Sequence, residues 1–351
     1  MPLITTTVSS PIAESFRVAQ VRGLFDLPPS NQSGETFTAQ LPEPEEAWTI
    51  GAIVGPSGSG KTTIARQVFG SALQTHSDWP RDRAMIDGFG DVPMKRLARV
   101  LTAVGLGSPP VWLRPYHVLS NGEQFRCQLA RAVIGSEQTG DGPDRLVVFD
   151  EFTSVVDRTV ARSASAALGK LLRRQGSVAA ESADQNLLPP LRFIAVTCHY
   201  DILDWLAPDW HLDMATGKLA RGGLQRPYMR LAVRRSPQAL WSLFARHHYL
   251  SGSLARSASC YVAFWDDRPV AFCATVGQLG HRGWKRISRL VTLPDYQGLG
   301  IGMKFVQRVC QAEVARGFRI SITTSHPAVI ASCSASPLWR LRRVKQLGGT
   351  R

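Results

Sequence analysis

The sequence predicts an α/β protein of two domains. The chain has 351 residues, which is more than one hydrophobic core usually organises. A glycine-rich loop stands twice between an apolar, strand-like run and a helical pattern, first at residues 55–63 and again at residues 297–302. Charge separates the same two regions, because residues 1–220 hold 20 Lys and Arg against 23 Asp and Glu, whereas residues 221–351 hold 21 against 4. We therefore expect one domain over residues 1–220 and a second, strongly basic domain over residues 225–351.

The composition is that of an ordinary folded protein, with 44% hydrophobic and 19% charged residues. No apolar run approaches the ~20 residues that cross a bilayer, and the N-terminus lacks the basic start and long apolar stretch of a secretory signal. The six cysteines form no C-x-x-C pair, which fits reduced thiols better than a disulfide framework or a zinc site. We expect a soluble, cytoplasmic protein with no membrane partner.

The N-terminal region is expected to begin with strands. Apolar clusters at residues 16–27 and 36–41 flank a stretch that contains Pro28, Pro29 and Gly34. Proline and glycine in this position are typical of a turn. The pattern predicts a pair of short strands around it.

A phosphate-binding loop follows the next strand. Residues 48–54 form an apolar run, residues 55–63 read GPSGSGKTT, and a helical pattern begins at Ile64. Glycines let the backbone N–H groups turn into a concavity, where the positive end of the helix attracts phosphate. Lys61 is expected to reach the β- and γ-phosphates of a nucleotide, and Thr62 to ligate Mg²⁺. The expected nucleotide contacts in this loop are Gly55, Ser57, Gly58, Gly60, Lys61, Thr62 and Thr63.

A second acidic motif lies about ninety residues further on. The apolar residues 146–149 are followed by Asp150 and Glu151. A buried parallel strand would deliver both carboxylates to the sheet edge where ligands bind. We expect Asp150 to hold Mg²⁺ and Glu151 to orient or deprotonate the attacking water. The alternative is a strand that ends in a solvated acidic turn. The presence of the lysine loop in the same chain makes the Mg²⁺ and water roles the better interpretation.

Residues 119–124 read LSNGEQ and lead into another helical pattern. The order of lysine loop, L-S-x-G-E, apolar-D-E and a later histidine resembles an ABC-type ATPase domain. The resemblance implies that Ser120 and Gly122 bind the γ-phosphate of ATP held by a second chain, that Asp157 ends the D-loop and that His199 is the switch histidine. It also implies ATP and Mg²⁺ as cofactors and an ATP-dependent, head-to-tail homodimer.

The sequence departs from the ABC-type pattern at several points. Asn121 replaces the usual glycine, Phe152 replaces the usual proline, and Asp87 is at best a substitute for the glutamine loop. The upstream aromatic candidate for stacking on adenine is Phe25, for which a core role is an equal alternative. No membrane domain is attached to this region, which disfavours transport.

The basic region predicts a second α/β domain. We expect strands at residues 228–233, 259–264, 269–276, 285–293 and 319–324, with helices at residues 239–249 and 303–316. The Q-x-x-G-x-G loop between the fourth strand and the second helix resembles the acetyl-coenzyme A pyrophosphate site of GNAT acyltransferases. That resemblance implies acetyl-CoA or another acyl-CoA as cofactor, held by Gln297, Gly298, Gly300 and Gly302. A dinucleotide site would need a parallel unit and a downstream acid, which we do not find.

The segment HHYLSG at residues 247–252 is unusual. It reads either as a helix end capped by glycine, or as an element similar to Mom-type phage proteins that modify adenine in DNA. His248 and Tyr249 are candidates for the general base and acid of acyl transfer, and the base itself stays unassigned.

The positive charge favours a nucleic-acid partner, with DNA preferred. Trp284 could stack on a base, and the expected phosphate contacts around it are Arg282, Lys285, Arg286 and Arg289.

Three functions remain open: a nucleic-acid acyltransferase coupled to an ATPase, an ATP-dependent nucleic-acid clamp with an inactive second domain, and a small-molecule or protein acetyltransferase with a regulatory ATPase. The last strand pair of a GNAT fold is not evident before Arg351, so we expect the second domain to lack its C-terminal strands.

Overall fold

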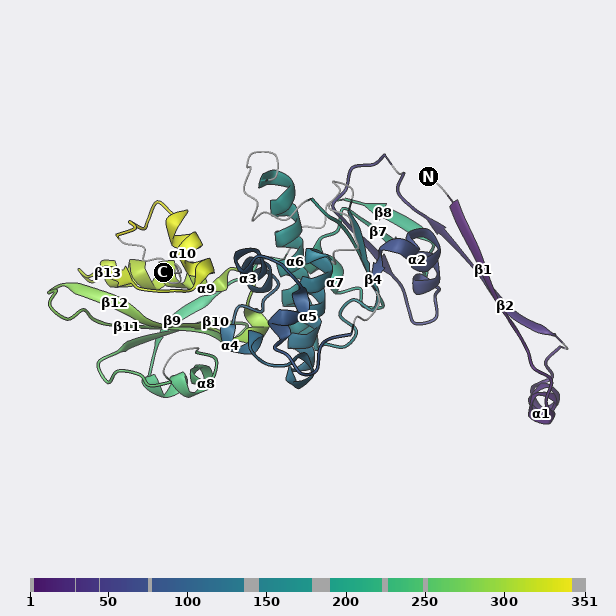
Figure 1. Ribbon diagram of the computed structural model, residues 1–351, viewed down its shortest axis with the longest axis horizontal. Coiled ribbons are helices and arrows are strands. Elements are labelled where there is room, and N and C mark those ends of the chain that lie inside the picture. The colour runs from purple at the N-terminus through teal and green to yellow at the C-terminus, as the bar shows by residue number, and fades with distance from the viewer. Residues whose placement is uncertain are drawn as a thin grey trace.

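The computed structural model describes residues 3–28, 30–43, 45–74, 78–135, 145–178, 190–222, 227–248 and 252–342. It contains two sheet-based domains, and a long two-stranded ribbon projects from the first of them (Figure 1). None of the described helices is long and apolar enough to span a membrane.

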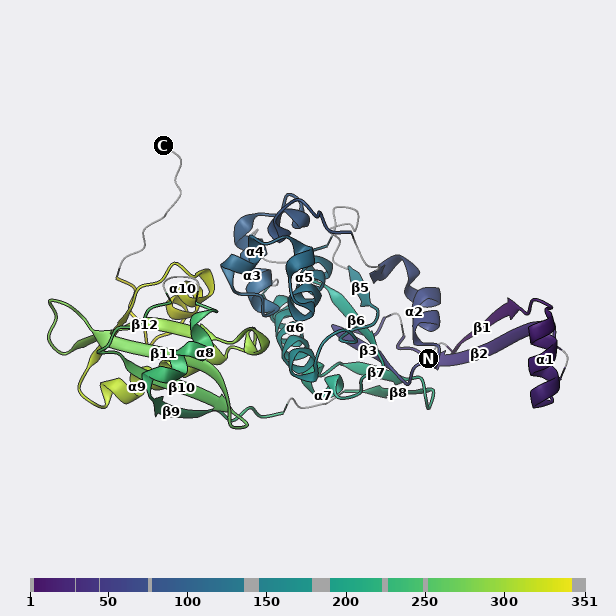
Figure 2. The same cartoon turned by 90° about the horizontal axis from the view of Figure 1, so that it is seen from below.

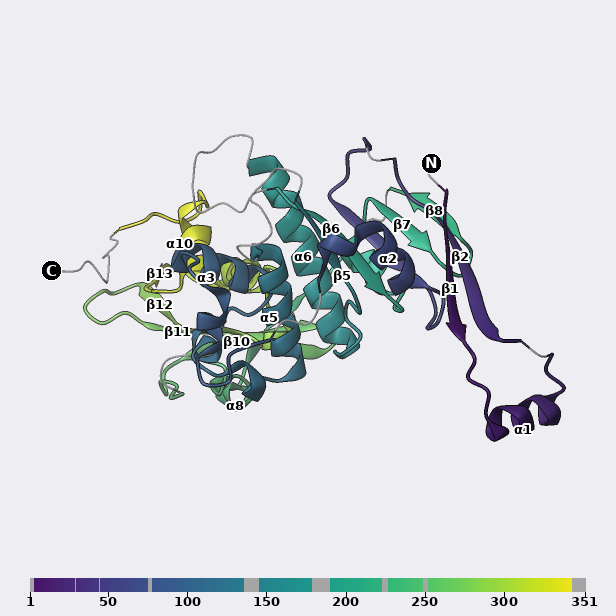
Figure 3. The ribbon, with the colours of Figure 1, turned by 45° about the vertical axis from the view of Figure 1, so that its right-hand side comes forward.

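The N-terminal ribbon consists of β1 (Leu3–Pro11) and β2 (Gln32–Gln40), which pair antiparallel. Helix α1 (Phe16–Phe25) lies at the tip of the ribbon, away from the body of the molecule (Figure 1, Figure 3). The strand expected over residues 16–27 is therefore wrong, whereas β2 covers most of the second expected strand. Helix formation is explained locally, because Ser15 caps the helix by accepting a hydrogen bond from the Val18 N–H at 3.2 Å.

The first domain is built on a six-stranded sheet of order β4-β5-β6-β3-β7-β8. Its strands are β3 (Ile50–Val54), β4 (Leu73–Gln74), β5 (Leu146–Phe149), β6 (Arg192–Thr197), β7 (Trp210–Asp213) and β8 (Lys218–Arg221). All neighbours pair parallel except β7 and β8. The expected strands before the phosphate loop and before Asp150 are confirmed. Because β8 includes Arg221, the first domain extends at least to that residue.

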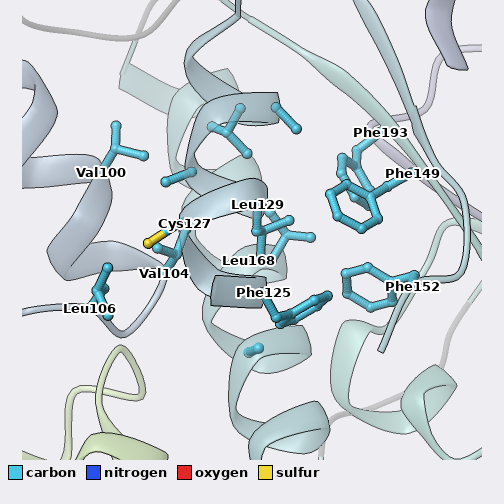
Figure 4. Close-up of a cluster of buried hydrophobic side chains, with 14 of the residues drawn as sticks. Val100, Val104, Leu106, Phe125, Cys127, Leu129, Phe149, Phe152, Leu168 and Phe193 are labelled. Carbon is cyan, nitrogen blue, oxygen red and sulfur yellow. The ribbon is translucent and has the colours of Figure 1, made fainter. Parts of the chain in front are cut away.

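Helices cover this sheet. They are α2 (Lys61–Phe69), α3 (Met94–Ala103), α4 (Pro109–Trp112), α5 (Asn121–Ile134), α6 (Arg158–Val178) and α7 (Ile202–Leu206), with short 3-10 turns η1 (Gly70–Ala72), η2 (Met85–Phe89) and η3 (Tyr116–Val118). Figure 4 shows the core that α5 and α6 share with the sheet. Phe152 is fully buried there, with its ring centroid 5.7 to 5.9 Å from those of Phe125, Phe149 and Phe193. An aromatic cluster thus explains why a phenylalanine follows the two carboxylates.

The second domain is built on a five-stranded sheet of order β13-β12-β11-β10-β9. Its strands are β9 (Ala232–Ser236), β10 (Ser259–Trp265), β11 (Arg268–Gly277), β12 (Trp284–Thr292) and β13 (Arg319–Ile322). Only β12 and β13 pair parallel. Helices α9 (Ile301–Val314) and α10 (Pro327–Ser334) lie on one side of the sheet, and η4 (Gln238–Trp241) with α8 (Ser242–Ala245) lies on the other (Figure 1).

The expected hairpin, the fourth strand and the second helix of this domain are confirmed. The first strand starts at Ala232 instead of residue 228, and Tyr228 is 92% exposed. The helix expected over residues 239–249 ends at Ala245. The boundaries that the hydrophobic pattern placed at Tyr228 and beyond Ala245 therefore lie too far out.

A buried carboxylate joins α9 to the sheet. Glu313 is fully buried and accepts hydrogen bonds from Tyr261 Oη, Thr275 Oγ1 and Lys285 Nζ at 2.9 Å, and from Arg316 at 3.0 Å. Burial by itself would raise the pKa of Glu313, but the bonds from Lys285, Tyr261 and Thr275 outweigh it and hold the pKa below its ordinary value. The charged form therefore stabilises the fold.

Replacing Glu313 by Gln should destabilise the second domain by about 3 kcal/mol, because Lys285 is left buried without a counter-charge. The carboxylate's contribution should be complete above the pKa of 4.5 of an unperturbed glutamate and be lost as pH falls through the lower folded-state pKa. Thermal unfolding of the whole chain across acidic pH measures both effects. Asp267→Asn is the control, because Asp267 is 94% exposed. Equal stability of the two variants would contradict this role.

Candidate functional site

The phosphate loop joins β3 to α2. Gly58 and Gly60 have φ values of +81° and +80°, a backbone conformation that favours glycine. Lys61 begins α2, and its ammonium donates to the carbonyl of Pro56 at 2.7 Å. Within the described parts of the chain, the Ser59 hydroxyl is buried and has no hydrogen-bond partner. A loop of turned N–H groups with a lysine and an unsatisfied hydroxyl fits the phosphates of a nucleotide.

The structure brings Thr62 and Asp150 together. Thr62 Oγ1 donates to Asp150 Oδ1 at 3.1 Å, across 88 positions of sequence. Hydroxyl and carboxylate oxygens are the ligands that Mg²⁺ takes beside ATP phosphates. Glu151 follows in the left-handed region, with φ +52°, and its N–H donates to Asp150 Oδ1 at 2.9 Å. This backbone turn leaves the Glu151 side chain exposed beside the pair.

His199 follows β6, at the same edge of the sheet as Asp150. Burial, and then the nearby Arg158 guanidinium, hold the pKa of His199 below its ordinary value of 6.5, so its imidazole is neutral at pH 7. Arg158 is itself ion-paired with Asp201, with Nε 3.1 Å from Oδ2. The charge of Glu151 acts on His199 in the opposite sense. The sequence did not single out Arg158, since its partner lies 43 positions away.

Ser120, Gly122 and Asp157 lie at helix starts. Ser120 caps α5 in a capping box with Glu123, whose carboxylate accepts from the Ser120 N–H at 2.9 Å. The Asp157 carboxylate accepts from the first N–H groups of α6, at 2.8 and 3.1 Å. Helix α5 lies apart from α2 in two perpendicular views (Figure 1, Figure 2). The helix that starts at Ser120 is thus separated from α2, which follows the phosphate loop of the same chain.

The aromatic residue at the phosphate loop is Phe37 and not Phe25. A Cβ atom placed on Gly60 would lie 2.3 Å from the Phe37 ring, so only glycine lets β2 approach so closely. Phe25 is 66% exposed on α1 at the far end of the ribbon (Figure 1). Phe37 is also nearer to the loop in sequence than Phe25, and the fold places its ring against Gly60. Asp87 lies exposed in η2.

The second glycine loop, residues 297–302, joins β12 and η5 (Pro294–Tyr296) to α9. Gly298 and Gly300 both have φ +80°, and the Gln297 amide donates to the Thr292 carbonyl at 3.1 Å. A Cβ atom on Gly302 would lie 3.0 Å from Thr292 Oγ1. The loop therefore presents the free N–H groups of a helix start, which fits a pyrophosphate.

Of the two catalytic candidates in the second domain, the structure describes only His248. His248 lies on the α8 side of the sheet, in an edge contact with Trp241 at 5.8 Å between ring centroids. Tyr249 lies outside the described residues. Burial, and then Arg246, lower the pKa of the neighbouring His247. The general base is not assigned by this geometry.

Two of the four proposed phosphate contacts have structural roles. Lys285 is ion-paired with Glu313, and Arg289 donates to the Ser253 carbonyl at 2.6 Å. Arg282 and Arg286 are exposed. Trp284 lies beneath two further arginines, Arg319 and Arg342, at 5.7 and 4.9 Å from the ring centroid. These two cations were not singled out, because they lie 35 or more positions from the tryptophan in sequence.

Fold and loops together define a chain that joins an ABC ATPase-like region to a GNAT acetyltransferase domain. Residues 256–332 match the family model described as acetyltransferase (GNAT) domain. The sequence is 31% identical to the Fe(3+) ions import ATP-binding protein FbpC of Pseudomonas fluorescens, in a match that covers 36% of this chain. The chain spans 44% of the length of that relative. The similarity of residues 247–252 to Mom-type proteins stays a prediction.

Solved structures align with each part separately. A dimeric bacterial ABC transporter cassette aligns with a TM-score of 0.35 at 15% identity, covering 55% of this chain and 94% of its own. An alanine N-acetyltransferase of a ribosomal protein from Escherichia coli aligns with a TM-score of 0.26 at 15% identity, covering 29% of this chain and 73% of its own.

Replacing Asp150 by Asn should lower Mg²⁺-dependent ATP hydrolysis by about a hundredfold, because the side chain keeps its size and loses the charge that would hold the metal. Steady-state hydrolysis over a range of Mg²⁺ concentrations measures this. Asp82→Asn, in an exposed loop of the same domain, should behave as the unchanged protein. An Asp150→Asn variant with normal hydrolysis and normal Mg²⁺ dependence would contradict the assignment.

Proposed function

We propose that the protein is an ATP-hydrolysing N-acyltransferase that acts on an amine of a nucleic acid. The observation that carries the proposal is that one chain holds both a phosphate loop with Thr62 and Asp150 in contact and a GNAT domain with its glycine loop at the start of α9. We call residues 1–221 the ATPase domain and residues 225–351 the acyltransferase domain.

In the ATPase domain the residues position the phosphates of ATP and neutralise their negative charge. Lys61 and the loop N–H groups hold the phosphates, and Thr62 with Asp150 holds Mg²⁺, which spreads the negative charge of ATP. Glu151 orients or deprotonates the attacking water. His199 is neutral at pH 7 because of its lowered pKa, so it can donate one hydrogen bond to the γ-phosphate without adding a charge.

In the acyltransferase domain the loop of residues 297–302 holds the pyrophosphate of an acyl-CoA, which supplies an activated thioester. The acceptor amine forms a C–N bond to the acyl carbon, and the C–S bond breaks. The proton that the amine loses passes to a base and ends on the sulfur, so that an amide and free CoA are released. His248 remains a candidate for that base.

The acceptor is proposed from charge. The exposed Arg282 and Arg286 lie on or beside the start of β12, where Arg319 and Arg342 flank Trp284. Several guanidinium groups around one indole are suited to a phosphate backbone with an accessible base. DNA is preferred over RNA as the substrate class, and a small molecule or protein is the competing acceptor.

Replacing Glu151 by Gln should trap an ATP-bound homodimer, because nucleotide binding is kept while the water is no longer activated. Size-exclusion chromatography with light scattering should show a dimer with Mg-ATP and a monomer without it. The double variant Glu151→Gln with Lys61→Ala is the control and should stay monomeric. A Glu151→Gln protein that remains monomeric at saturating Mg-ATP counts against two shared sites.

Incubation of the full chain with isotope-labelled acetyl-CoA, Mg-ATP and duplex or single-stranded DNA should give a labelled nucleoside by mass spectrometry. DNA affinity should fall with salt at about 0.9 logarithmic units per phosphate contact, and Arg286→Ala should reduce that slope by about one contact. Arg268→Ala, exposed at the far end of β11 from Arg286, should leave it unchanged. Label on protein or small amines only, with a flat salt profile, would exclude the nucleic-acid acceptor.

A further inference from the structure

The ATPase domain is docked on the acyl-CoA loop, residues 297–302. The Gly107 N–H donates to Gln297 Oε1 at 2.9 Å, and His326 Nε2 lies 3.1 Å from the Gly107 carbonyl oxygen. A Cβ atom placed on Gly298 would lie 2.7 Å from Ala167 Cβ and 2.8 Å from the Ala103 carbonyl oxygen. The loop between α3 and α4 and the middle of α6 thus contact the segment that is expected to hold pyrophosphate.

In this contact the backbone of the α3–α4 loop lies directly against the backbone of the acyl-CoA loop. A Cβ atom on Gly105 would lie 3.0 Å from the Gln297 carbonyl oxygen. On the acyl-CoA loop, a Cβ atom on Gly300 would lie 2.9 Å from Lys170 Nζ. Glycine in a phosphate loop lets a ligand come close to the backbone. Here the space beside Gly298 is filled by the other domain, so a ligand that needs that space competes with the docked domain.

Helix α6, one of the elements that dock, also starts at the expected D-loop residue Asp157. Helix α6 begins directly after Asp157 and reaches Ala167 and Lys170 about 15 to 20 Å further along its axis. It is packed into the core through Leu168 and Leu172. A rigid-body shift of α6 would therefore move its first turn and its contact with the acyl-CoA loop together.

Arg126 makes a second connection. It lies about 1.7 turns along α5 from Ser120 and is 1% exposed, and its Nε has no hydrogen-bond partner among the residues that the structure describes. The acidic groups whose charges act on it are Asp295, beside the acyl-CoA loop, and Glu123 and Asp157 in the ATPase domain. Burial lowers its pKa. A buried cation between the two sites responds to a rearrangement on either side.

We propose that this docking is an autoinhibitory contact: the ATPase domain closes the acyl-CoA loop, and ATP binding between two chains releases it. The inference rests on the proposed function. When ATP binds, Ser120, Gly122 and Asp157 contact the nucleotide of a second chain. This contact draws α5 and α6 away from Gln297 and Gly298. Acyl-CoA binding and ATP binding are then positively coupled, and the coupling is reciprocal.

The test measures acetyl-CoA affinity by calorimetry on the full chain. In the Glu151→Gln variant, Mg-ATP should tighten acetyl-CoA binding by about tenfold, and the effect should vanish when Lys61→Ala is added. Trp205→Ala should tighten acetyl-CoA binding without ATP by about fivefold, because the Trp205 ring contacts Trp265 of the other domain at 5.7 Å between centroids. Trp48→Ala is the matched control, since Trp48 makes a similar edge contact with Trp210 inside the ATPase domain.

The outcomes separate the two proposals. Equal acetyl-CoA affinity with and without Mg-ATP, together with an unchanged Trp205→Ala variant, overturns the autoinhibitory contact and leaves the acyltransferase function standing. Weaker binding in Trp205→Ala also overturns it, because the ATPase domain would then complete the acyl-CoA site instead of closing it. Absence of acetyl-CoA binding in every variant and condition overturns the acyltransferase function itself.

Discussion

Helix α6 is the constraint on which the rest of the structure depends. Its first turn is capped by Asp157 and carries Arg158, the ion-pair partner of Asp201 beside His199. Its apolar side chains form the core with α5 and the sheet (Figure 4), while Ala167 faces the second domain. One helix therefore connects Asp157, the core and the contact between the two domains.

Two glycine loops with the same backbone chemistry have different surroundings. Gly60 is opposed by Phe37, a side chain of its own domain, whereas Gly298 is opposed by Ala167 and Ala103 of the other domain. The group beside Gly60 is one side-chain ring, whereas the groups beside Gly298 are a helix residue and a backbone carbonyl, which move only with their domain.

The sequence predicted the elements whose neighbours are close in sequence. Strand, glycine loop and helix follow each other directly at residues 50–69, and the β10–β11 hairpin closes around Asp266 and Asp267. Helix α1 was missed because proline and glycine next to its apolar residues indicated a turn between strands, although Ser15 is a good helix cap. The contact of Gly107 with Gln297 spans 190 positions and no motif marks it, so only the folded chain shows it.

The distribution of acids in the basic domain decides where its charge is uncompensated. Residues 221–351 hold four acidic residues: Asp266, Asp267, Asp295 and Glu313. Two form the turn after β10, Asp295 acts on Arg126 in the other domain, and Glu313 is buried with Lys285 and Arg316. No exposed acid of this segment is left for Arg282 and Arg286 at the opposite end of the sheet. Like charges held together in this way repel one another, and a polyanion is the class of partner that removes this repulsion. The proposed nucleic-acid acceptor thus supplies at this end of the domain the negative charge that its own sequence lacks.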